Sequence, residues 1–335
     1  MKEIGSEFWT SYPCAPVGNT DNERCLMSGR TALRFIIDDI CKTGTIRKAL
    51  LPSYCCESMI IPFVHLGIDV QFYEVTQNGV YYPYDNDADV ILLIDFFGYK
   101  NSQNSVIAQL EKQEGKVIIY DATHKLDGNP DVQKYADYSF CSYRKWFFCN
   151  FATAVKHNGA FVNNKALPFN QRYVAMREDA ARAKERYFAE SNGYKEEFLA
   201  KFSSAERILE DDYAGYAGVP VTFDCQKIIS KRKENALYLT ENLKNIRGVK
   251  LWCDDIQIED APMFVPILVD PLIRNDLRQR LIDEKIYCPI HWPKSAYHRE
   301  CNELYDTELS LVCDQRYDAS DMERMVRVIT DFFNG

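Results

Sequence analysis

Two short stretches of this chain end in side chains that can do chemistry. An apolar run at residues 117–120 leads into Asp121, with His124 three residues later, and a second β-type run leads into Ser142-x-x-Lys145. In an open α/β sheet, functional groups gather at the carboxyl ends of the strands. A lysine there can form a Schiff base with an aldehyde cofactor, and a carboxylate can keep a basic ring nitrogen of that cofactor protonated. The sequence therefore predicts a site for such a cofactor between these two strand ends.

A third stretch, Ser28-Gly29-Arg30-Thr31, opens a predicted helix and favours an anion. The free N–H groups and the dipole at a helix start suit a phosphate, although Ser and Thr are also ordinary helix caps. Lys145 lies between Cys-Ser-Tyr-Arg and Trp-Phe-Phe, and partly apolar surroundings would lower its pKa and make the amine nucleophilic. Taken alone, Asp121 could be a loop cap and His124 a satisfied polar residue. The order of all three stretches along the chain favours the cofactor site.

The elements that must position these residues alternate along the chain. Apolar runs predict strands at residues 48–52, 68–73, 90–94 and 117–120, and helical spacing predicts helices at 30–41, 58–66 and 105–113. This alternation with short connections is typical of a mostly parallel sheet that is wound with helices. After Lys145, Asn158-Gly159 predicts a tight hairpin between strands at 152–156 and 160–162.

The second half of the chain alternates less regularly. Residues 169–212 are rich in Ala, Glu, Arg and Lys, which predicts long helices, with the charge run at 177–186 on a solvated face. Gly215 and Gly218-Val219-Pro220 then predict a domain boundary. Beyond it we expect helices at 227–243, 271–283 and 322–333, and strands at 263–269 and 309–313. The organisation is thus an N-terminal arm (1–20), a large cofactor-binding domain (21–215) and a small C-terminal domain (216–335).

Composition narrows the class of protein. The 335 residues carry 40 Lys and Arg against 49 Asp and Glu, a net charge of -9, which argues against a nucleic-acid partner. No stretch approaches the roughly 20 apolar residues of a membrane span, and the first residues lack the apolar segment of a signal peptide. Twelve cysteines then predict reduced thiols in the cytoplasm. Cys288-x-x-His291 and His298-x-x-Cys301 have a spacing that zinc accepts, but the loop between them lacks a knuckle signature, and we predict no metal site.

Together these motifs resemble the DegT/DnrJ/EryC1/StrS family of sugar aminotransferases, which use pyridoxal 5'-phosphate (PLP) on fold type I. The resemblance runs in order over residues 25–330. It is carried by Ser28-Gly-Arg-Thr-Ala-Leu33, Leu51-Pro-Ser-Tyr54, Phe72-Tyr-Glu-Val75, Asp121-Ala-Thr-His124, Ser142-Tyr-Arg-Lys145, Ile286-Tyr-Cys-Pro-Ile-His-Trp-Pro293 and Leu309-Ser-Leu-Val-Cys-Asp-Gln-Arg-Tyr317. It implies an α/β protein of the PLP-dependent transferase fold, with a mostly parallel central sheet wound with helices and a smaller α+β C-terminal domain.

The resemblance also implies a role for each site residue. Lys145 would hold PLP as an internal aldimine and move the proton, Asp121 would pair with the pyridinium nitrogen, and His124 would lie near the phenolic oxygen. The phosphate would be held by Gly29, Arg30, Thr31 and Ser142. The family's stacking aromatic residue falls by register on Cys56, so we assign the stacking to Tyr54, two residues earlier on the same strand face. Contacts to the substrate are expected from Phe97, Tyr99, His291 and Trp292.

The implied activity is transfer of an amino group from an amino acid, glutamate, to a nucleotide-linked keto-sugar, by a ping-pong mechanism in a homodimer. The arginine that binds an α-carboxylate in amino-acid aminotransferases would fall near Glu308, with Arg316 nearest, which disfavours a dedicated amino-acid enzyme. The family's Gly-rich stretch after the lysine and its Gly-x-Asn-x-Arg segment are not found. Two alternatives therefore stay open: another PLP-dependent reaction (a lyase, a dehydratase or an amino-acid aminotransferase) and a non-catalytic protein on the same fold.

Overall fold

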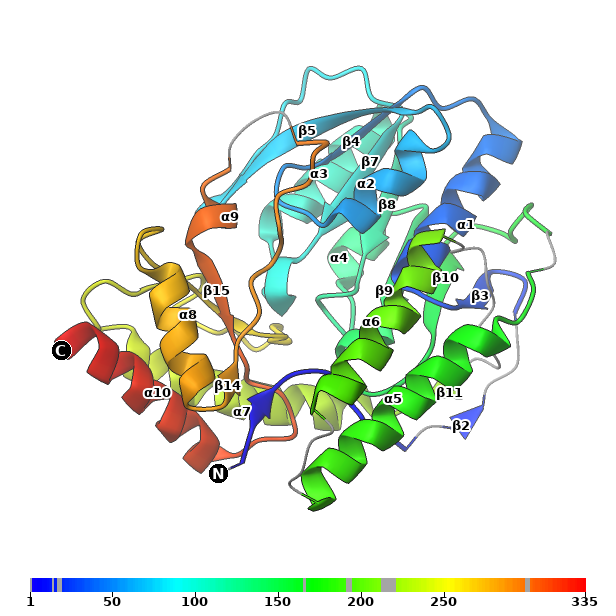
Figure 1. The fold of residues 1–335 in the computed structure, drawn as a ribbon. Helices are drawn as coiled ribbons and strands as arrows, with labels where there is room; N and C mark the ends of the chain where they lie inside the picture. The colour runs from blue at the N-terminus through cyan, green and yellow to red at the C-terminus, as the bar shows by residue number, and fades with distance from the viewer. Residues whose placement is uncertain are drawn as a thin grey trace.

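An eight-stranded sheet forms the centre of the larger part of the protein (Figure 1). The computed structural model describes residues 2–13, 15–16, 20–164, 167–190, 195–211, 221–298 and 302–335. The strands lie side by side in the order β3 (Glu23–Leu26), β10 (Ala152–Lys156), β9 (Tyr138–Ser142), β8 (Val117–Asp121), β7 (Val90–Ile94), β4 (Lys48–Pro52), β5 (Asp69–Thr76) and β6 (Gly79–Tyr81). The strands from β9 to β5 are parallel, whereas β10 and β6 run antiparallel to their neighbours. The predicted, mostly parallel sheet is confirmed.

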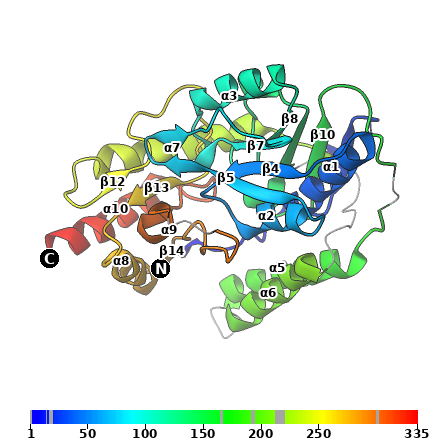
Figure 2. The ribbon, with the colours of Figure 1, turned by 90° about the horizontal axis from the view of Figure 1, so that it is seen from above.

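Helices cover both faces of this sheet (Figure 2). The helices α1 (Gly29–Thr43) and α2 (Glu57–Val64) lie on one face, and α3 (Ser102–Gln113) lies on the other; the short α4 (Pro130–Gln133) follows β8. Alternate residues of β7 face opposite ways, as strand geometry requires. Ile91 and Leu93 pack with Ile107 of α3, whereas Val90 and Leu92 share a cluster with α1 and α2. A strand that is buried on both faces must be apolar throughout, which explains its sequence Val-Ile-Leu-Leu-Ile.

Residues 221–335 build a smaller part around an antiparallel sheet of β12 (Lys250–Leu251), β13 (Val265–Leu268) and β15 (Glu308–Leu311). The helices α7 (Cys225–Leu243), α8 (Arg274–Asp283) and α10 (Ala319–Asn334) share a separate hydrophobic cluster with this sheet, and the short α9 (Leu304–Thr307) precedes β15. Near the N-terminus, β1 (Ile4–Gly5) pairs with β14 (Ile286–Tyr287) and β2 (Ala15–Pro16) with β11 (Val221–Thr222). The predicted arm is therefore held against the C-terminal part of the chain.

Two long helices, α5 (Gln171–Glu190) and α6 (Lys195–Asp211), pack against each other beside the sheet (Figures 1 and 2). They confirm the helices predicted for residues 169–212, but the solvated face predicted for 177–186 is wrong at two positions. Arg177 is 2% exposed and Lys184 is fully buried. The Lys184 amine donates to the carbonyl oxygen of Glu7 and lies over the ring of Trp9, 4.6 Å from its centroid. The arm thus supplies partners for a helix face that looks solvated in the sequence.

The hairpin predicted around Asn158-Gly159 is wrong. The chain does turn there, with Gly159 at a φ of 83°, but residues 160–162 form no strand. The strand β10 already pairs with β9 along one edge and with β3 along the other, so neither edge is free for a returning strand. Phe161 instead packs against Phe35 of α1, at 5.1 Å between ring centroids.

The predicted domain boundary lies outside the described residues, since 212–220 are not among them. The division into an arm (1–20) and domains 21–215 and 216–335 therefore stays a prediction. No helix within the described ranges is long and apolar enough to cross a membrane.

Candidate active site

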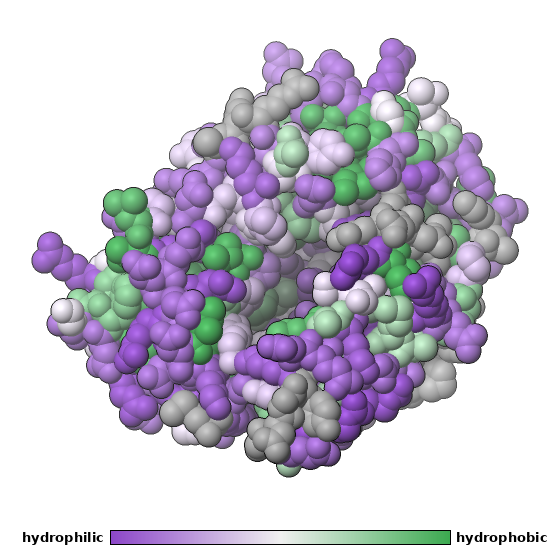
Figure 3. All heavy atoms as spheres, in the orientation of Figure 1, coloured by the Kyte–Doolittle hydropathy of each residue, from purple (hydrophilic) through white to green (hydrophobic). Residues whose placement is uncertain are grey.

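A cavity of about 210 Å³ lies where the carboxyl ends of β8 and β9 meet the first turn of α1. It corresponds to the hollow near the centre of the molecule in Figure 3. The residues predicted for the site that line it are Gly29, Arg30, Asp121, His124, Ser142, Lys145 and Trp292. Further walls come from the start of α2 (Cys56, Ser58, Met59), from Thr123 and Arg144, and from α6 (Glu206, Leu209). The three sequence stretches that could do chemistry therefore converge on one space.

Asp121 ends β8 as a buried carboxyl group that is fixed by a local turn. Its Oδ1 accepts the backbone N–H of Thr123 at 2.8 Å, and the Thr123 hydroxyl accepts the backbone N–H of Ser142 at 3.2 Å. These bonds tie the ends of β8 and β9 together. Burial raises the pKa of Asp121 to about 6, although the hydrogen bonds from Thr123 pull in the opposite direction. A nearby cation would stabilise the charged form of this buried carboxyl group.

His124 is a neutral imidazole with a fixed tautomer. The backbone N–H of Phe97 donates to its Nδ1 at 3.1 Å, and only an unprotonated Nδ1 can accept, so the ring proton resides on Nε2. Burial, followed by the charge of Lys145, lowers the pKa of His124 to about 3. Phe97 has a left-handed backbone with a φ of 57°, a conformation that is costly for a residue with a side chain. His124 is therefore a permanent N–H donor, and Trp292 stacks on it at 5.4 Å with 25° between the rings.

Lys145 lies in η2 (Tyr143–Lys145), the single turn that follows β9. Its side chain remains accessible because it borders the cavity, while protein surrounds it on the other sides. Burial and then the positive charge of Arg144 lower the pKa of Lys145, whereas Glu7 and Glu206 oppose that change. A larger share of this amine is therefore unprotonated, and so nucleophilic, than of an ordinary lysine.

The start of α1 forms the opposite wall. Ser28 caps the helix: its Oγ accepts the N–H of Thr31 at 3.2 Å and lies 2.9 Å from the Thr31 hydroxyl. The helix leaves the N–H groups of its first residues, Gly29 and Arg30, without intrahelical partners. A Cβ at Gly29 would lie 3.1 Å from Cβ of Ser142, so the two walls meet closely only because residue 29 is glycine. This corner suits an anion.

The structure places two of the predicted phosphate contacts differently from the expectation. The Thr31 hydroxyl is used in the cap and does not line the cavity. The Arg30 guanidinium group donates to the carbonyl oxygen of Leu209 at 2.8 Å and so holds α6. The backbone N–H of Arg30 therefore lies in the first helical turn beside that of Gly29, where it could contact an anion. The side chain of Arg30 instead forms part of the cavity wall.

Glu206 of α6 is a site residue that sequence reasoning missed. Its carboxylate pairs with Arg144, next to Lys145, and with Arg177 at 3.2 Å. Burial raises the pKa of Glu206, but the charges of Arg144 and Arg177 outweigh burial and lower this pKa to about 2. Within the sequence, Glu206 belongs to a charged helix without any motif, so no local signal marks it.

Four predicted site residues lie behind the cavity wall: Tyr54, Phe97, Tyr99 and His291. Tyr54 packs on Trp292 at 5.1 Å, and His291 bonds the Ser310 hydroxyl through Nδ1 at 2.9 Å. The strand-face argument for Tyr54 fails because β4 ends at Pro52, and residues 53–56 have no strand alternation. Cys56 caps α2 and lines the cavity instead, with its Sγ 2.7 Å from the Ser58 hydroxyl.

The Cys288-x-x-His291 and His298-x-x-Cys301 motifs have the spacing of zinc ligands, but the described residues do not form a metal site. No group of three or more His, Cys, Asp or Glu side chains among them is arranged to hold a metal ion. Cys301 lies outside the described residues. The ring of His298 packs at a tilt against Phe72, 4.8 Å between centroids, and contacts the hydroxyl of Tyr305, so it takes part in packing between β5 and the segment before α9.

No protein-family model and no curated protein sequence matches this chain. Solved structures of aminotransferases nevertheless share its fold. DesI, solved in the presence of its TDP-sugar product, matches 92% of this chain and 79% of its own with a TM-score of 0.63 and 12% identity. A DegT DnrJ EryC1 StrS aminotransferase from Brucella abortus matches 93% of this chain and 86% of its own (TM-score 0.61, 16% identity). For Spr1654 from Streptococcus pneumoniae in its PLP-form the shares are 93% and 87% (TM-score 0.63, 13% identity).

The fold of this chain is therefore the fold of DegT/DnrJ/EryC1/StrS sugar aminotransferases. The resemblance predicted from the sequence is confirmed at the level of the fold.

Proposed function

We propose that this protein is a PLP-dependent aminotransferase that moves an amino group from an amino acid to a keto-sugar. The observation that carries the proposal is one cavity lined by an amine, a buried carboxyl group, a neutral imidazole and an open helix start. These belong to Lys145, Asp121, His124 and Gly29. Each group alone is common, but their meeting at the strand ends of this fold matches the needs of a single cofactor.

The residues at the cavity fit PLP at both of its ends. The buried carboxyl group of Asp121, with a pKa raised to about 6, would be compensated by a protonated ring nitrogen. The corner between Gly29 and Ser142, which a Cβ would fill, suits the phosphate. When bound, PLP supplies an electron sink that eases removal of the proton from the amino-bearing carbon.

The side chains of the chain itself would then divide the remaining work. Lys145, with its lowered pKa, would bind the aldehyde and act as the base that takes and returns the proton. Asp121 would hold the proton on the ring nitrogen. His124 would donate its Nε2–H to a ring oxygen without exchanging protons, since its pKa of about 3 keeps it neutral. Trp292 and Cys56 would exclude water from one side of the cavity.

Two observations support a keto-sugar acceptor over a dedicated amino-acid enzyme. Both oxygens of Asp314 bind Arg316, at 2.9 and 2.7 Å, and Arg316 does not line the cavity. The nearby position 308 holds a buried glutamate that accepts the backbone N–H of His291 at 2.7 Å. Neither residue offers a free guanidinium group to an α-carboxylate. The TDP-sugar product of DesI supports a nucleotide-linked substrate, and we propose glutamate as the amino donor.

Visible absorbance tests the proposal directly. The purified protein, supplemented with PLP, should turn yellow, bleach on addition of L-glutamate, and do neither after Lys145→Ala. Recovery of the colour with a nucleotide-linked keto-sugar would identify the acceptor class. A stable colour that no amino donor bleaches would favour a lyase or dehydratase, and a protein that never turns yellow would refute the proposal in favour of a non-catalytic role.

We also propose that the protein is a cytoplasmic homodimer, by analogy with the resemblance described above. Light scattering of the purified chain should give twice the monomer mass of 38.9 kDa. A mass equal to that of the monomer would contradict the dimer without bearing on the chemistry.

A further inference from the structure

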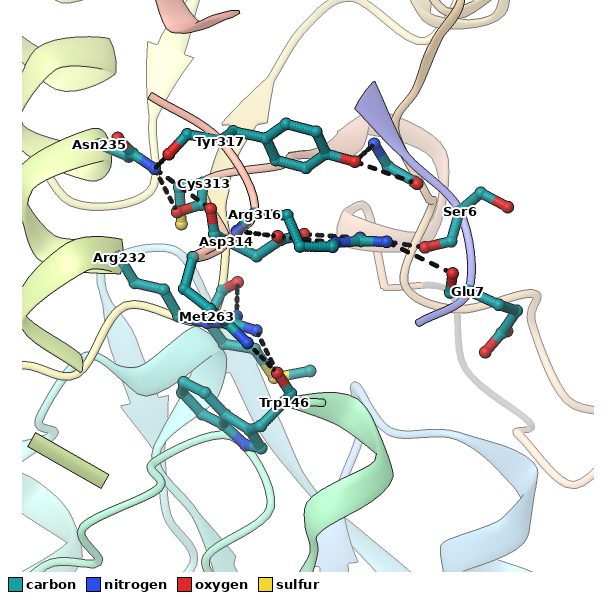
Figure 4. Close-up of polar contacts among 12 residues, drawn as sticks. Ser6, Glu7, Trp146, Arg232, Asn235, Met263, Cys313, Asp314, Arg316 and Tyr317 are labelled. Carbon is teal, nitrogen blue, oxygen red and sulfur yellow. Dashed lines mark hydrogen bonds and ion pairs between the residues drawn. The ribbon is translucent and has the colours of Figure 1, made fainter. Parts of the chain in front are cut away.

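A single buried guanidinium group, that of Arg232 in α7, reaches two segments of the candidate active site from the C-terminal part of the chain (Figure 4). Its Nη2 donates to the carbonyl oxygen of Trp146 at 3.2 Å, and its Nη1 donates to that of Met263 at 2.8 Å. Its Nε donates to the side-chain oxygen of Gln315 at 2.8 Å. Arg232 is 1% exposed, and Figure 4 shows it between the Trp146 and Met263 carbonyl groups.

The first segment is that of Lys145. Trp146 follows Lys145 directly, and its carbonyl oxygen accepts a second hydrogen bond from Gln315 at 2.6 Å. The indole N–H of Trp146 donates to the carbonyl oxygen of Thr123 at 2.7 Å. The guanidinium carbon of Arg232 lies over the indole ring, 4.3 Å from its centroid. Trp146 therefore links Lys145 to the turn that carries Asp121 and His124. Arg232 contacts Trp146 twice, through a hydrogen bond to its carbonyl group and through a cation–π contact with its ring.

The second segment is that of His124. The backbone N–H of Met263 donates to the carbonyl oxygen of Phe97 at 2.8 Å. The N–H of Phe97 in turn fixes the Nδ1 of His124. The hydrogen bonds of Arg232 thus lead through Trp146 to the segment of Lys145, and through Met263 and Phe97 to the imidazole of His124.

The chemistry of the Arg232 site argues that these bonds are more than packing. Its three hydrogen bonds go to uncharged oxygens. Asp314, the carboxylate whose charge acts on Arg232, is bound to Arg316 by two hydrogen bonds (Figure 4). Burying a cation without a directly bonded anion is unfavourable, and an apolar side chain would fill the same space at lower cost. The planar fork of a guanidinium group can bind two carbonyl groups from different segments in fixed directions, which no apolar residue can do.

We propose that Arg232 is a positioning residue that sets Lys145 and His124 relative to each other by holding the carbonyl groups of Trp146 and Met263. The roles of Lys145 and His124 rest on the proposed function, but the positional coupling does not. Because Arg232 belongs to α7, a displacement of the C-terminal part of the chain is transmitted to Lys145 through this group.

The test compares Arg232→Met with Arg316→Met. Arg316 is the control because it is a partly buried arginine of the same network that reaches Ser6 and Glu7 and does not bond Trp146 (Figure 4). Arg232→Lys keeps the charge without the fork, and serves as the second variant if Arg232→Met does not fold. Urea midpoints of all variants show how much of any change is loss of stability.

The first readout needs no cofactor. An amine-reactive reagent is applied across a range of pH, and labelling of Lys145 is followed by mass spectrometry. The groups that face this amine are Arg144 on its own segment, Glu206 of α6, Glu7 of the arm, and Cys56 and His124 at the cavity. We expect Arg232→Met to raise the labelling midpoint of Lys145 toward that of an ordinary lysine, and Arg232→Lys to raise it less. Arg316→Met loosens Glu7, whose charge raises the pKa of Lys145, so this variant should not raise the midpoint.

The second readout is attachment of PLP to Lys145, trapped by borohydride reduction. Misplacement of a reacting group by a distant change costs about tenfold to a hundredfold in rate, and we expect a loss in this range for Arg232→Met only. If both arginine variants shift the Lys145 midpoint equally, or if neither does, the positioning role is wrong. If the unaltered protein never attaches PLP, the proposed function fails, and the labelling comparison still decides the role of Arg232.

Discussion

Replacing Asp121 by asparagine should stabilise the cofactor-free protein at neutral pH. The carboxyl group is buried, and burial raises its pKa from an ordinary 3.8 to about 6. The folded chain therefore binds the Asp121 proton more tightly than the unfolded chain does, and the folded state loses stability as the pH rises from about 4 to 6. The difference between the two pKa values corresponds to about 3 kcal/mol at neutral pH. The asparagine side chain would keep the acceptor for the N–H of Thr123 but carry no charge, so this penalty would disappear.

Urea unfolding of the unaltered protein and of Asp121→Asn, both without cofactor, measures this difference. We expect a gain of about 3 kcal/mol at pH 8 that shrinks toward zero near pH 4. Asp254→Asn, at an exposed position, is the matched control and should show no such trend. With PLP added the order should reverse, because only the carboxylate can pair with a ring cation. An Asp121→Asn protein that is no more stable at pH 8 than the unaltered chain would refute the account of a desolvated carboxyl group.

Two further substitutions test other walls of the cavity. Gly29→Ala would place a Cβ 3.1 Å from Cβ of Ser142, in the space proposed for the phosphate. Fluorescence titration should show binding of PLP weakened by about tenfold or more, whereas binding of pyridoxal, which lacks the phosphate, should be almost unchanged. Equal losses for both ligands would contradict an anion site between Gly29 and Ser142. Glu206→Gln removes a charge that raises the pKa of Lys145, so the pH midpoint for chemical labelling of Lys145 should fall, and a midpoint that rises would show that Glu206 acts on Lys145 in another way.

Local patterns in the sequence were sufficient to place the main chemical groups. Asp121 and Lys145 end apolar runs, and the register of β7, β8 and β9 brings such ends to one edge of the sheet. Gly29 begins a helix whose apolar spacing is clear. In each case the sequence pattern that predicts the strand or helix lies within a few residues of the side chain it positions, so hydrophobic periodicity is enough to locate it.

Features that depend on partners distant in the chain were not predictable in the same way. Glu206 enters the cavity only because α6 packs on α5 and is held by Arg30, far earlier in the sequence. The strands β3 and β9 occupy both edges of β10, which leaves no edge for the strand predicted at 160–162. Strand alternation predicts stacking by Tyr54 only if β4 continues to that residue, but β4 ends at Pro52. These outcomes are set by tertiary pairing, which a single sequence does not display.

The pair of helices α5 and α6 has a consequence for how this scaffold can diversify. They pack mainly against each other, yet α6 contributes Glu206 and Leu209 to the cavity wall. Changes to the Leu209 side chain on this face of α6 would reshape the space open to a substrate while leaving the strands of the sheet unchanged. When acceptor preference is changed by directed evolution, we expect substitutions to appear on the cavity face of α6 sooner than in β8 and β9, which lead to the proposed catalytic residues.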